Sequence, residues 1–140
     1  MATGKLNTMV DLQKAVIQPL NGALFEDRQV QSRILRLDLI HPVISGNKWF
    51  KLKYYLQEAL QLGRKGLFSF GGAYSNHLLA TAAAARAAGL ASAALVRGEA
   101  PASLSGTLKD AAALGMELNF VSRRDYQQRQ HPDFLRHWQH

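Results

Sequence analysis

The stretch "GLFSFGGAYSNHLLATAAAARAAGLASAALVR", residues 66–97, alternates short apolar runs with an alanine-rich segment. Residues 66–70 and 91–97 are apolar runs of strand length, and residues 77–89 have the composition of a helix closed by a final glycine. The small side chains of this helix and its near lack of charge predict burial on more than one face. A strand, a helix and a second strand in this order predict a parallel sheet.

A further helix is predicted immediately upstream, beginning at Lys48 and closed by Gly63. Apolar side chains recur there at helical spacing: Trp49, Leu52, Leu56, Ala59 and Leu60. Before this helix, "RILRLDLI" (residues 33–40) alternates apolar with charged residues, which is typical of a half-buried strand. The first thirty residues are mixed and show no clear period.

Two further elements are predicted downstream. In "EAPASLSGTLKDAAALG" (residues 99–115), a loop leads into a helix with Ser105 as its N-cap and Gly115 as its stop. "MELNFV" (residues 116–121) is a third apolar run of strand length. The predicted fold class is therefore α/β, a parallel sheet with flanking helices. The remaining segment is polar and shows no further strand.

The composition narrows the classes of function. The 140 residues can form one modest domain, and the absence of cysteine excludes a thiolate nucleophile and a cysteine metal site. The five histidines are His41, His77, His131, His137 and His140. None shows the pairing with an acidic residue that is typical of a helical zinc site, so no metal site is predicted. The formal charge of +7 comes from dispersed lysines and arginines. We therefore expect no nucleic-acid partner, and an anionic cofactor or substrate stays open.

The N-terminal sequence gives an expectation about location. "MATGKLNTMVDLQKAVIQPL" (residues 1–20) is interrupted by polar residues before the apolar core of a signal peptide could form. No apolar run of the sequence is long enough to span a bilayer. We therefore expect a cytoplasmic protein with no membrane contact.

Two stretches could carry chemistry, and each is the start of a predicted helix. "SGNKWFKLK" (residues 45–53) contains three lysines. In "SFGGAYSNH" (residues 69–77), two glycines allow close backbone approach to a ligand, and the unpaired N–H groups of the helix start favour an anion. Taken alone, the first stretch also fits a solvated basic helix, and the second fits an ordinary capped turn. The second stretch lacks the later glycine of a dinucleotide fingerprint and the lysine of a P-loop.

Together, the two stretches resemble a known family. Gly-Asn-Lys followed by Lys-Leu, and then Ser-x-Gly-Gly-x-x-Ser-Asn one helix and one strand later, are similar to motifs of the 1-aminocyclopropane-1-carboxylate deaminase and D-cysteine desulfhydrase family of pyridoxal-phosphate enzymes. "GMELNFVSRRDY" (residues 115–126) is similar to the third strand and exit loop of that family. The resemblance covers residues 35–126 and implies the N-terminal half of a tryptophan synthase β-like fold: most of the small domain plus part of the large domain.

The resemblance implies roles for the lysine stretch. Lys48 matches the catalytic lysine that forms a Schiff base with the aldehyde of pyridoxal 5'-phosphate, which requires a neutral amine and thus a lowered pKa. Lys51, one turn on, would be a second cofactor contact that faces the phosphate, although it also fits a surface cation. Asn47 would orient the loop, and Lys53 is expected to be solvated.

The resemblance also implies roles at the second helix start. Asn76 matches the asparagine that hydrogen-bonds the ring hydroxyl oxygen of the cofactor. Ser75 matches a catalytic serine beside the substrate carboxylate. The backbone N–H groups from Ser75 to His77 would hold that carboxylate, although His77 also fits a helix-start residue without a role. Tyr74 differs from the glutamine usual in the deaminases, which leaves the substrate open.

The chain departs from the family in length. No later glycine-rich phosphate loop, which the second half of family members supplies, follows Gly89. We therefore expect an N-terminal portion with three parts. Residues 1–50 would belong to the large domain and carry the lysine loop, residues 51–126 would form the small α/β domain, and residues 127–140 would be an incomplete polar segment.

The implied function is pyridoxal-phosphate-dependent deamination or lysis of a small amino acid, giving a 2-oxo acid and ammonia. The substrate would be of the 1-aminocyclopropane-1-carboxylate or D-cysteine type. Since half of the site is missing from the sequence, the alternative is a catalytically inert fragment or a partner-binding remnant, and whether the chain is an enzyme stays open. The expected associations are a homodimer or contact through the face left exposed by truncation.

Overall fold

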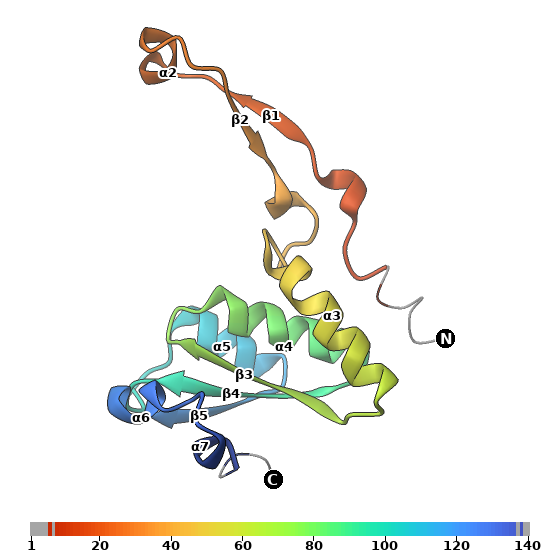
Figure 1. Ribbon diagram of the computed structural model, residues 1–140, viewed down its shortest axis with the longest axis vertical. Coiled ribbons are helices and arrows are strands. Elements are labelled where there is room, and N and C mark those ends of the chain that lie inside the picture. The colour runs from red at the N-terminus through yellow and green to blue at the C-terminus, as the bar shows by residue number, and fades with distance from the viewer. Residues whose placement is uncertain (1–5, 7, 137, 139–140) are drawn as a thin grey trace.

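The computed structural model describes residue 6, residues 8–136 and residue 138. Its centre is a parallel sheet in the order β3-β4-β5, formed by Gly66–Gly72, Ala91–Arg97 and Met116–Val121. The helices α4 (Asn76–Ala88) and α5 (Gly106–Ala113) connect successive strands and lie on one face of this sheet (Figure 1). The predicted α/β class and parallel sheet with flanking helices are therefore confirmed.

Local capping and packing explain why α4 forms where the sequence predicts it. The Ser75 hydroxyl accepts a hydrogen bond from the Leu78 N–H at 3.3 Å, which caps the start of the helix. The helix ends at Gly89, whose φ of 75° is a left-handed conformation that glycine adopts without steric cost. Ala82 packs against the sheet, and Ala80 belongs to a second apolar cluster with α3. Burial on more than one face of α4 is therefore confirmed.

The helix α3 (Lys48–Gln61) packs beside α4. It buries Trp49, Leu52, Leu56 and Ala59, as the helical spacing predicts. Two buried residues of the preceding loop, Ile40 and Ile44, join the same apolar cluster. This cluster holds the first turn of α3, which carries Lys48, against α4.

Residues 17–35 form an arm that extends away from this α/β unit (Figure 1). In the arm, β1 (Ile17–Leu20) pairs antiparallel with β2 (Ser32–Leu35), and the short helix α2 (Ala23–Asp27) lies at its tip. A 3₁₀ turn, η1 (Leu12–Lys14), precedes it. The sequence predicts none of these elements before residue 31.

The strand predicted over residues 33–40 is wrong in two respects. Its regular part ends at Leu35, and Leu37–Leu39 form a second 3₁₀ turn, η2. It is also not half-buried, since the side chains of Ile34 and Leu35 are 44% and 53% exposed. Alternation buries a strand face only where a second layer covers it, and a two-stranded ribbon outside the core has no such layer.

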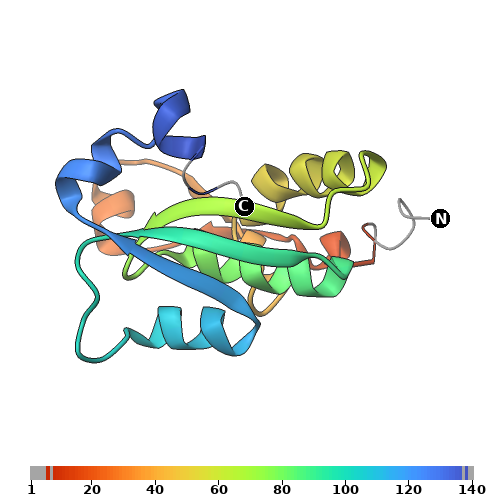
Figure 2. The same ribbon diagram turned by 90° about the horizontal axis from the view of Figure 1, so that it is seen from below.

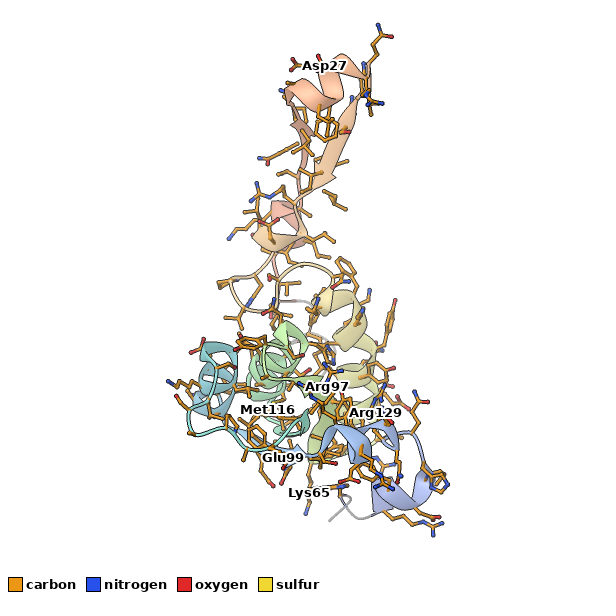
Figure 3. All side chains as sticks on the ribbon, turned by 90° about the vertical axis from the view of Figure 1, so that its left-hand side faces the viewer. Asp27, Lys65, Arg97, Glu99, Met116 and Arg129 are labelled. Carbon is orange, nitrogen blue, oxygen red and sulfur yellow. The ribbon has the colours of Figure 1, made fainter. Side chains whose placement is uncertain are left out.

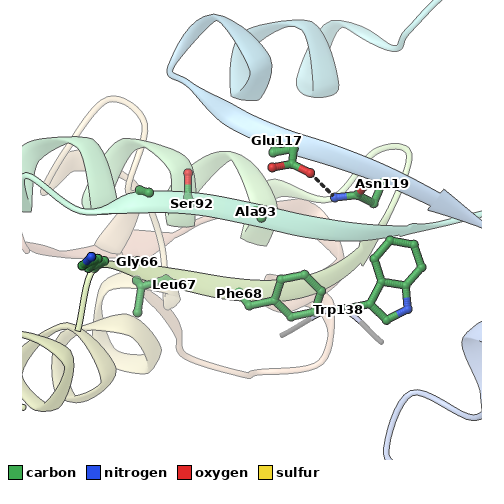
Figure 4. A pocket seen from close by; sticks show the side chains of 10 residues that line it. Gly66, Leu67, Phe68, Ser92, Ala93, Glu117, Asn119 and Trp138 are labelled. Carbon is green, nitrogen blue, oxygen red and sulfur yellow. Dashed lines mark hydrogen bonds between the residues drawn. The ribbon is translucent and has the colours of Figure 1, made fainter. Parts of the chain in front are cut away.

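The other face of the sheet is only partly covered. Seen from below, the strands lie in front of α4 and α5 (Figure 2). Two short helices follow the last strand, α6 (Arg123–Gln127) and α7 (Pro132–Arg136). A hollow of about 640 Å³ opens on the sheet between Phe68, Ala93, Asn119 and Trp138 (Figure 4). None of the residues predicted for the functional site lines it.

Two expectations, that no segment spans a membrane and that no metal site is present, can be compared with the described residues only. Among them, no helix is both long and apolar enough to cross a membrane, and no three histidine or acidic side chains are grouped to hold a metal ion. His137 and His140 lie outside the described residues. The division into parts at residues 50 and 126 stays a prediction.

Candidate functional site

The predicted site residues lie at the starts of two neighbouring helices. Lys48 is the first residue of α3, and Asn76 is the first residue of α4. The two helices pack side by side, and α3 leads through β3 into α4. This connection brings the lysine stretch and the second stretch to the same end of β3.

A histidine organises the loop in front of Lys48. The Nδ1 atom of His41 accepts hydrogen bonds from the N–H groups of Val43 and Ile44, at 2.9 and 2.8 Å. Burial lowers the pKa of His41 below its ordinary value, which keeps Nδ1 free to accept these bonds. Gly46 then takes a φ of 61°, a left-handed conformation, and its N–H donates to the Leu37 carbonyl at 2.9 Å. The loop that delivers Lys48 is therefore fixed at both ends.

The lysines of the first stretch differ in their surroundings. Lys48 is half-buried as a residue, and its Nζ donates an exposed hydrogen bond to the Asn47 Oδ1 at 2.6 Å, so the two residues predicted to work together are in contact. Lys51 is exposed one turn further on. The Nζ of Lys53 instead lies 4.6 Å from the ring centroid of Tyr54 and 5.7 Å from that of Phe50. Lys53, which was expected to be solvated, is half-buried and makes cation–π contacts.

The turn between β3 and α4 requires a glycine for a reason that the sequence does not reveal. A Cβ atom on Gly71 would lie 2.6 Å from the Leu78 Cγ and 2.7 Å from the Ser75 Oγ. The end of β3 therefore touches the first turn of α4 directly. Gly71 serves close packing of strand and helix, whereas the sequence suggested close approach to a ligand.

A long-range hydrogen bond also holds this turn. The hydroxyl of Ser105, the N-cap of α5, donates to the Ala73 carbonyl and accepts from the Leu108 N–H at 3.2 Å. The two residues joined in this way are 32 positions apart in the chain. The backbone in front of Ser75 is therefore anchored to the start of a different helix.

His77 connects the two stretches. Its Nε2 lies 3.0 Å from the Ser69 Oγ of β3, and its ring is half-buried. The pKa of His77 is lowered by burial and further by the positive charges of Lys48 and Lys51. The lysines at the start of α3 therefore act electrostatically on the start of α4. Lys48 and Lys51 lie in the first turn of α3, and His77 lies in the first turn of α4, which packs beside α3.

A hollow of about 320 Å³ lies beside His77, between β3 and the two helices. It is lined by apolar and polar side chains: Leu52, Tyr55, Leu67, Phe68, Ser69, Phe70, His77 and Thr81. Ser75 and Asn76 border the same turn, with Ser75 engaged as N-cap and Asn76 exposed. Ser69 is the first residue of the Ser-x-Gly-Gly-x-x-Ser-Asn motif, but no role of its own was predicted for it.

Comparisons with known proteins bear on this arrangement. No protein-family model matches the chain. A protein of Thermotoga maritima named "Putative 1-aminocyclopropane-1-carboxylate deaminase" is 40% identical over 94 residues, which are 67% of this chain and 30% of that protein. A protein of Pyrococcus abyssi with the same name is 39% identical over 66 residues, or 47% of this chain and 20% of that protein.

A solved structure agrees with these matches. A crystal structure described as that of an ACC deaminase homologue aligns with a TM-score of 0.67 and 27% sequence identity, over 86% of this chain and 37% of that chain. This chain therefore spans about a third, or less, of the length of the relatives that it matches. Such partial coverage agrees with the N-terminal portion expected from the sequence.

Proposed function

Since the chain matches part of the 1-aminocyclopropane-1-carboxylate deaminase family in sequence and in fold, we propose that it carries the lysine side of a pyridoxal 5'-phosphate site. In this proposal the site acts on a small amino acid and yields a 2-oxo acid and ammonia. The observation that carries it is that Lys48 and Asn76, one from each sequence motif, are the first residues of two helices that pack side by side.

The donor set of the described residues fits this cofactor. The Lys48 amine is held by a single described hydrogen bond, to Asn47, and can leave it. Lys51 adds an exposed positive charge one turn away, suited to a phosphate. The Asn76 amide is exposed, and no described residue hydrogen-bonds its side chain, so it is free to bind a ring oxygen. When bound, pyridoxal phosphate supplies the electron sink for charge that develops beside the substrate amino group.

The chain's own residues would position the substrate and move its protons. Lys48 is the base that takes and returns a proton at its Nζ. Ser75 presents its hydroxyl at the start of α4, where the backbone N–H groups of residues 76 and 77 attract a carboxylate. The Ser75 N–H, which was predicted to belong to this set, instead donates to the Gly72 carbonyl at 3.1 Å. His77, kept neutral by its surroundings, adds a polar group without adding a charge.

The second candidate function is that of a catalytically inert, partner-binding remnant. It is supported by the arm, whose apolar side chains are uncovered; Ile17 and Leu24 are 65% and 69% exposed. Such a surface favours association, either with a second copy of this chain or with another polypeptide that covers it. Turnover of D-cysteine or of 1-aminocyclopropane-1-carboxylate by the chain alone would refute this candidate.

The decisive experiment follows the covalent lysine. Adding pyridoxal phosphate should produce the visible absorbance of the cofactor condensed with an amine, and borohydride reduction followed by peptide mapping should find the label on Lys48. Lys48→Ala should abolish both signals. Lys53→Ala is the matched control, because it removes a lysine of the same helix that contacts two rings instead. A label that persists in Lys48→Ala, or that maps to Lys53, would show the assignment to be wrong.

A further inference from the structure

Three arginines converge at the carboxyl ends of β4 and β5. Arg97 is the last residue of β4, Arg123 is the first residue of α6, and Arg129 follows α6 closely. Together with Tyr126 and Gln127 they line a hollow of about 330 Å³. Arg97 and Arg129 come from distant parts of the chain and lie near one another in Figure 3. The volume is within the range of small-molecule sites, about 300–1,000 Å³.

Tyr126 holds two of these guanidinium groups in place. The Arg129 guanidinium carbon lies 4.7 Å from the Tyr126 ring centroid, and Arg129 Nη1 also donates to the Tyr126 carbonyl at 3.1 Å. The Arg97 guanidinium carbon lies 5.9 Å from the same ring. The ring is itself in edge contact with Phe70 of β3, at a centroid distance of 6.5 Å. Because these contacts restrain the Arg97 and Arg129 side chains, a ligand would lose less conformational entropy on binding.

No described carboxylate neutralises this cluster. None of the ion pairs among the described residues includes Arg97, Arg123 or Arg129. The closest acidic residue in sequence, Asp125, accepts a hydrogen bond from the Ser122 hydroxyl at 2.8 Å, and it does not line the hollow. Three like charges around one hollow repel each other, and a bound anion would offset that repulsion.

We propose that Arg97, Arg123 and Arg129 bind an oxyanion of the phosphate class, carried by free phosphate or by a small phosphorylated molecule. A carboxylate offers two oxygens, which one planar guanidinium can satisfy, whereas a tetrahedral phosphate offers oxygens to several guanidinium groups at once. The location supports a ligand site, because open α/β sheets bind ligands outside the carboxyl ends of their strands. The site is made of residues other than Lys48, Ser75 and Asn76, so it does not depend on the function proposed above.

The site borders the turn that leads to Ser75. A Cβ atom on Gly72, the last residue of β3, would lie 3.8 Å from the Arg97 Nη2. The Arg97 guanidinium therefore extends from β4 toward the end of the neighbouring strand. An anion held by Arg97 would sit beside the backbone that carries the second sequence motif.

The test is a titration with inorganic phosphate at constant ionic strength, followed by NMR of the arginine Nε–H groups and of Tyr126. We expect saturable shifts, and Arg123→Gln should weaken binding about tenfold. Arg124→Gln removes the same charge from the next residue of α6, which does not line the hollow, and should weaken binding less than about twofold. The Arg123 side chain makes no described hydrogen bond, ion pair or ring contact, so its replacement should leave the thermal unfolding midpoint unchanged.

The outcomes separate a built site from general charge attraction. Equal weakening by Arg123→Gln and Arg124→Gln, or shifts that do not saturate, would overturn the proposal. So would binding of a single-stranded oligonucleotide without saturable binding of phosphate, because it would indicate a nucleic-acid surface. A parallel titration with glycerol phosphate distinguishes free phosphate from a small phosphorylated molecule as the source of the anion. Tighter binding than inorganic phosphate supports a small phosphorylated molecule, and equal binding supports the free anion.

Discussion

The arm and the α/β unit use similar apolar residues with opposite results. Ile17 and Leu24 of the arm are mostly exposed, whereas Leu56 and Leu78 of the unit are completely buried. The difference lies in the layers that cover each region. The apolar faces of α4 meet the sheet, α3 and α5, and among the described residues the two-stranded arm has no such covering layer. An apolar pattern therefore indicates which side chains can be buried, and only a second layer decides whether they are.

The largest expected effect contrasts one leucine from each region. Leu78→Ala should lower the free energy of unfolding by about 3 kcal/mol, since it removes a fully buried side chain and leaves a cavity. Leu24→Ala, in the arm, should change it by less than about 0.5 kcal/mol. Urea denaturation of both variants measures the difference. Equal losses of unfolding free energy in the two variants would mean that another surface covers the arm in solution.

The next effect tests the tight junction inside the unit. Gly71→Ala should destabilise the protein by about 1–3 kcal/mol, because its methyl group would meet Leu78 and Ser75 at less than 3 Å. Gly72→Ala is the matched control, since its Cβ would find its nearest neighbour at 3.8 Å, an ordinary contact. Thermal and urea unfolding would reveal the difference. A Gly71→Ala protein as stable as Gly72→Ala would contradict the close packing of β3 against α4.

A smaller effect concerns pH and the histidines of the unit. The folded pKa values of His41 and His77 are both lowered, so the unfolded chain binds more protons than the folded chain below about pH 6.5. The stability that they contribute is present above the unfolded pKa and is lost as the pH falls through the folded pKa. Urea denaturation between pH 7.5 and 5 should show this decline. His41→Asn combined with His77→Gln should flatten it, and an unchanged decline would assign it to other groups.

The smallest effect examines how the two helix starts are coupled. Lys51→Gln removes a positive charge that lowers the pKa of His77, so this pKa should rise in the variant. NMR titration of the His77 ring measures it. Lys53→Gln is the control, because Lys53 is directed at Tyr54 and Phe50 and should leave the pKa of His77 unchanged. Equal shifts of the His77 pKa in both variants would indicate that it responds to the overall positive charge of the chain and not to Lys51 in particular.

The α/β unit could be predicted from the sequence much better than the arm. Between residues 48 and 121 the sequence predicts every helix and strand, because local signals agree with packing: serines cap α4 and α5, and glycines end α3, α4 and α5. Of the arm, only a strand that overlaps β2 was predicted, with the wrong end and the wrong burial. The arm's strands lack a buried face, Pro19 lies within β1, and the alternation over residues 33–40 suggested a burial that no second layer provides.

The candidate site was predictable only in part. Lys48, Ser75 and Asn76 were identified from motif resemblance, and their roles stay predictions. The contact between His77 and Ser69 depends on how β3 packs against α4, and sequence spacing does not determine that packing. The arginine cluster was not predicted either. Arg97 and Arg123 belong to different elements that meet only when β4 and β5 pair in parallel.

The hydrogen bond from Ser105 to the Ala73 carbonyl has a consequence for motion. Because the same hydroxyl also caps α5, outward movement of the turn before Ser75 breaks one of the two bonds that hold the capping side chain in place. We therefore expect local opening of the turn to be coupled to fraying at the start of α5. In hydrogen exchange, the Leu108 amide should report on the mobility of a turn 32 positions away from its cap in the chain.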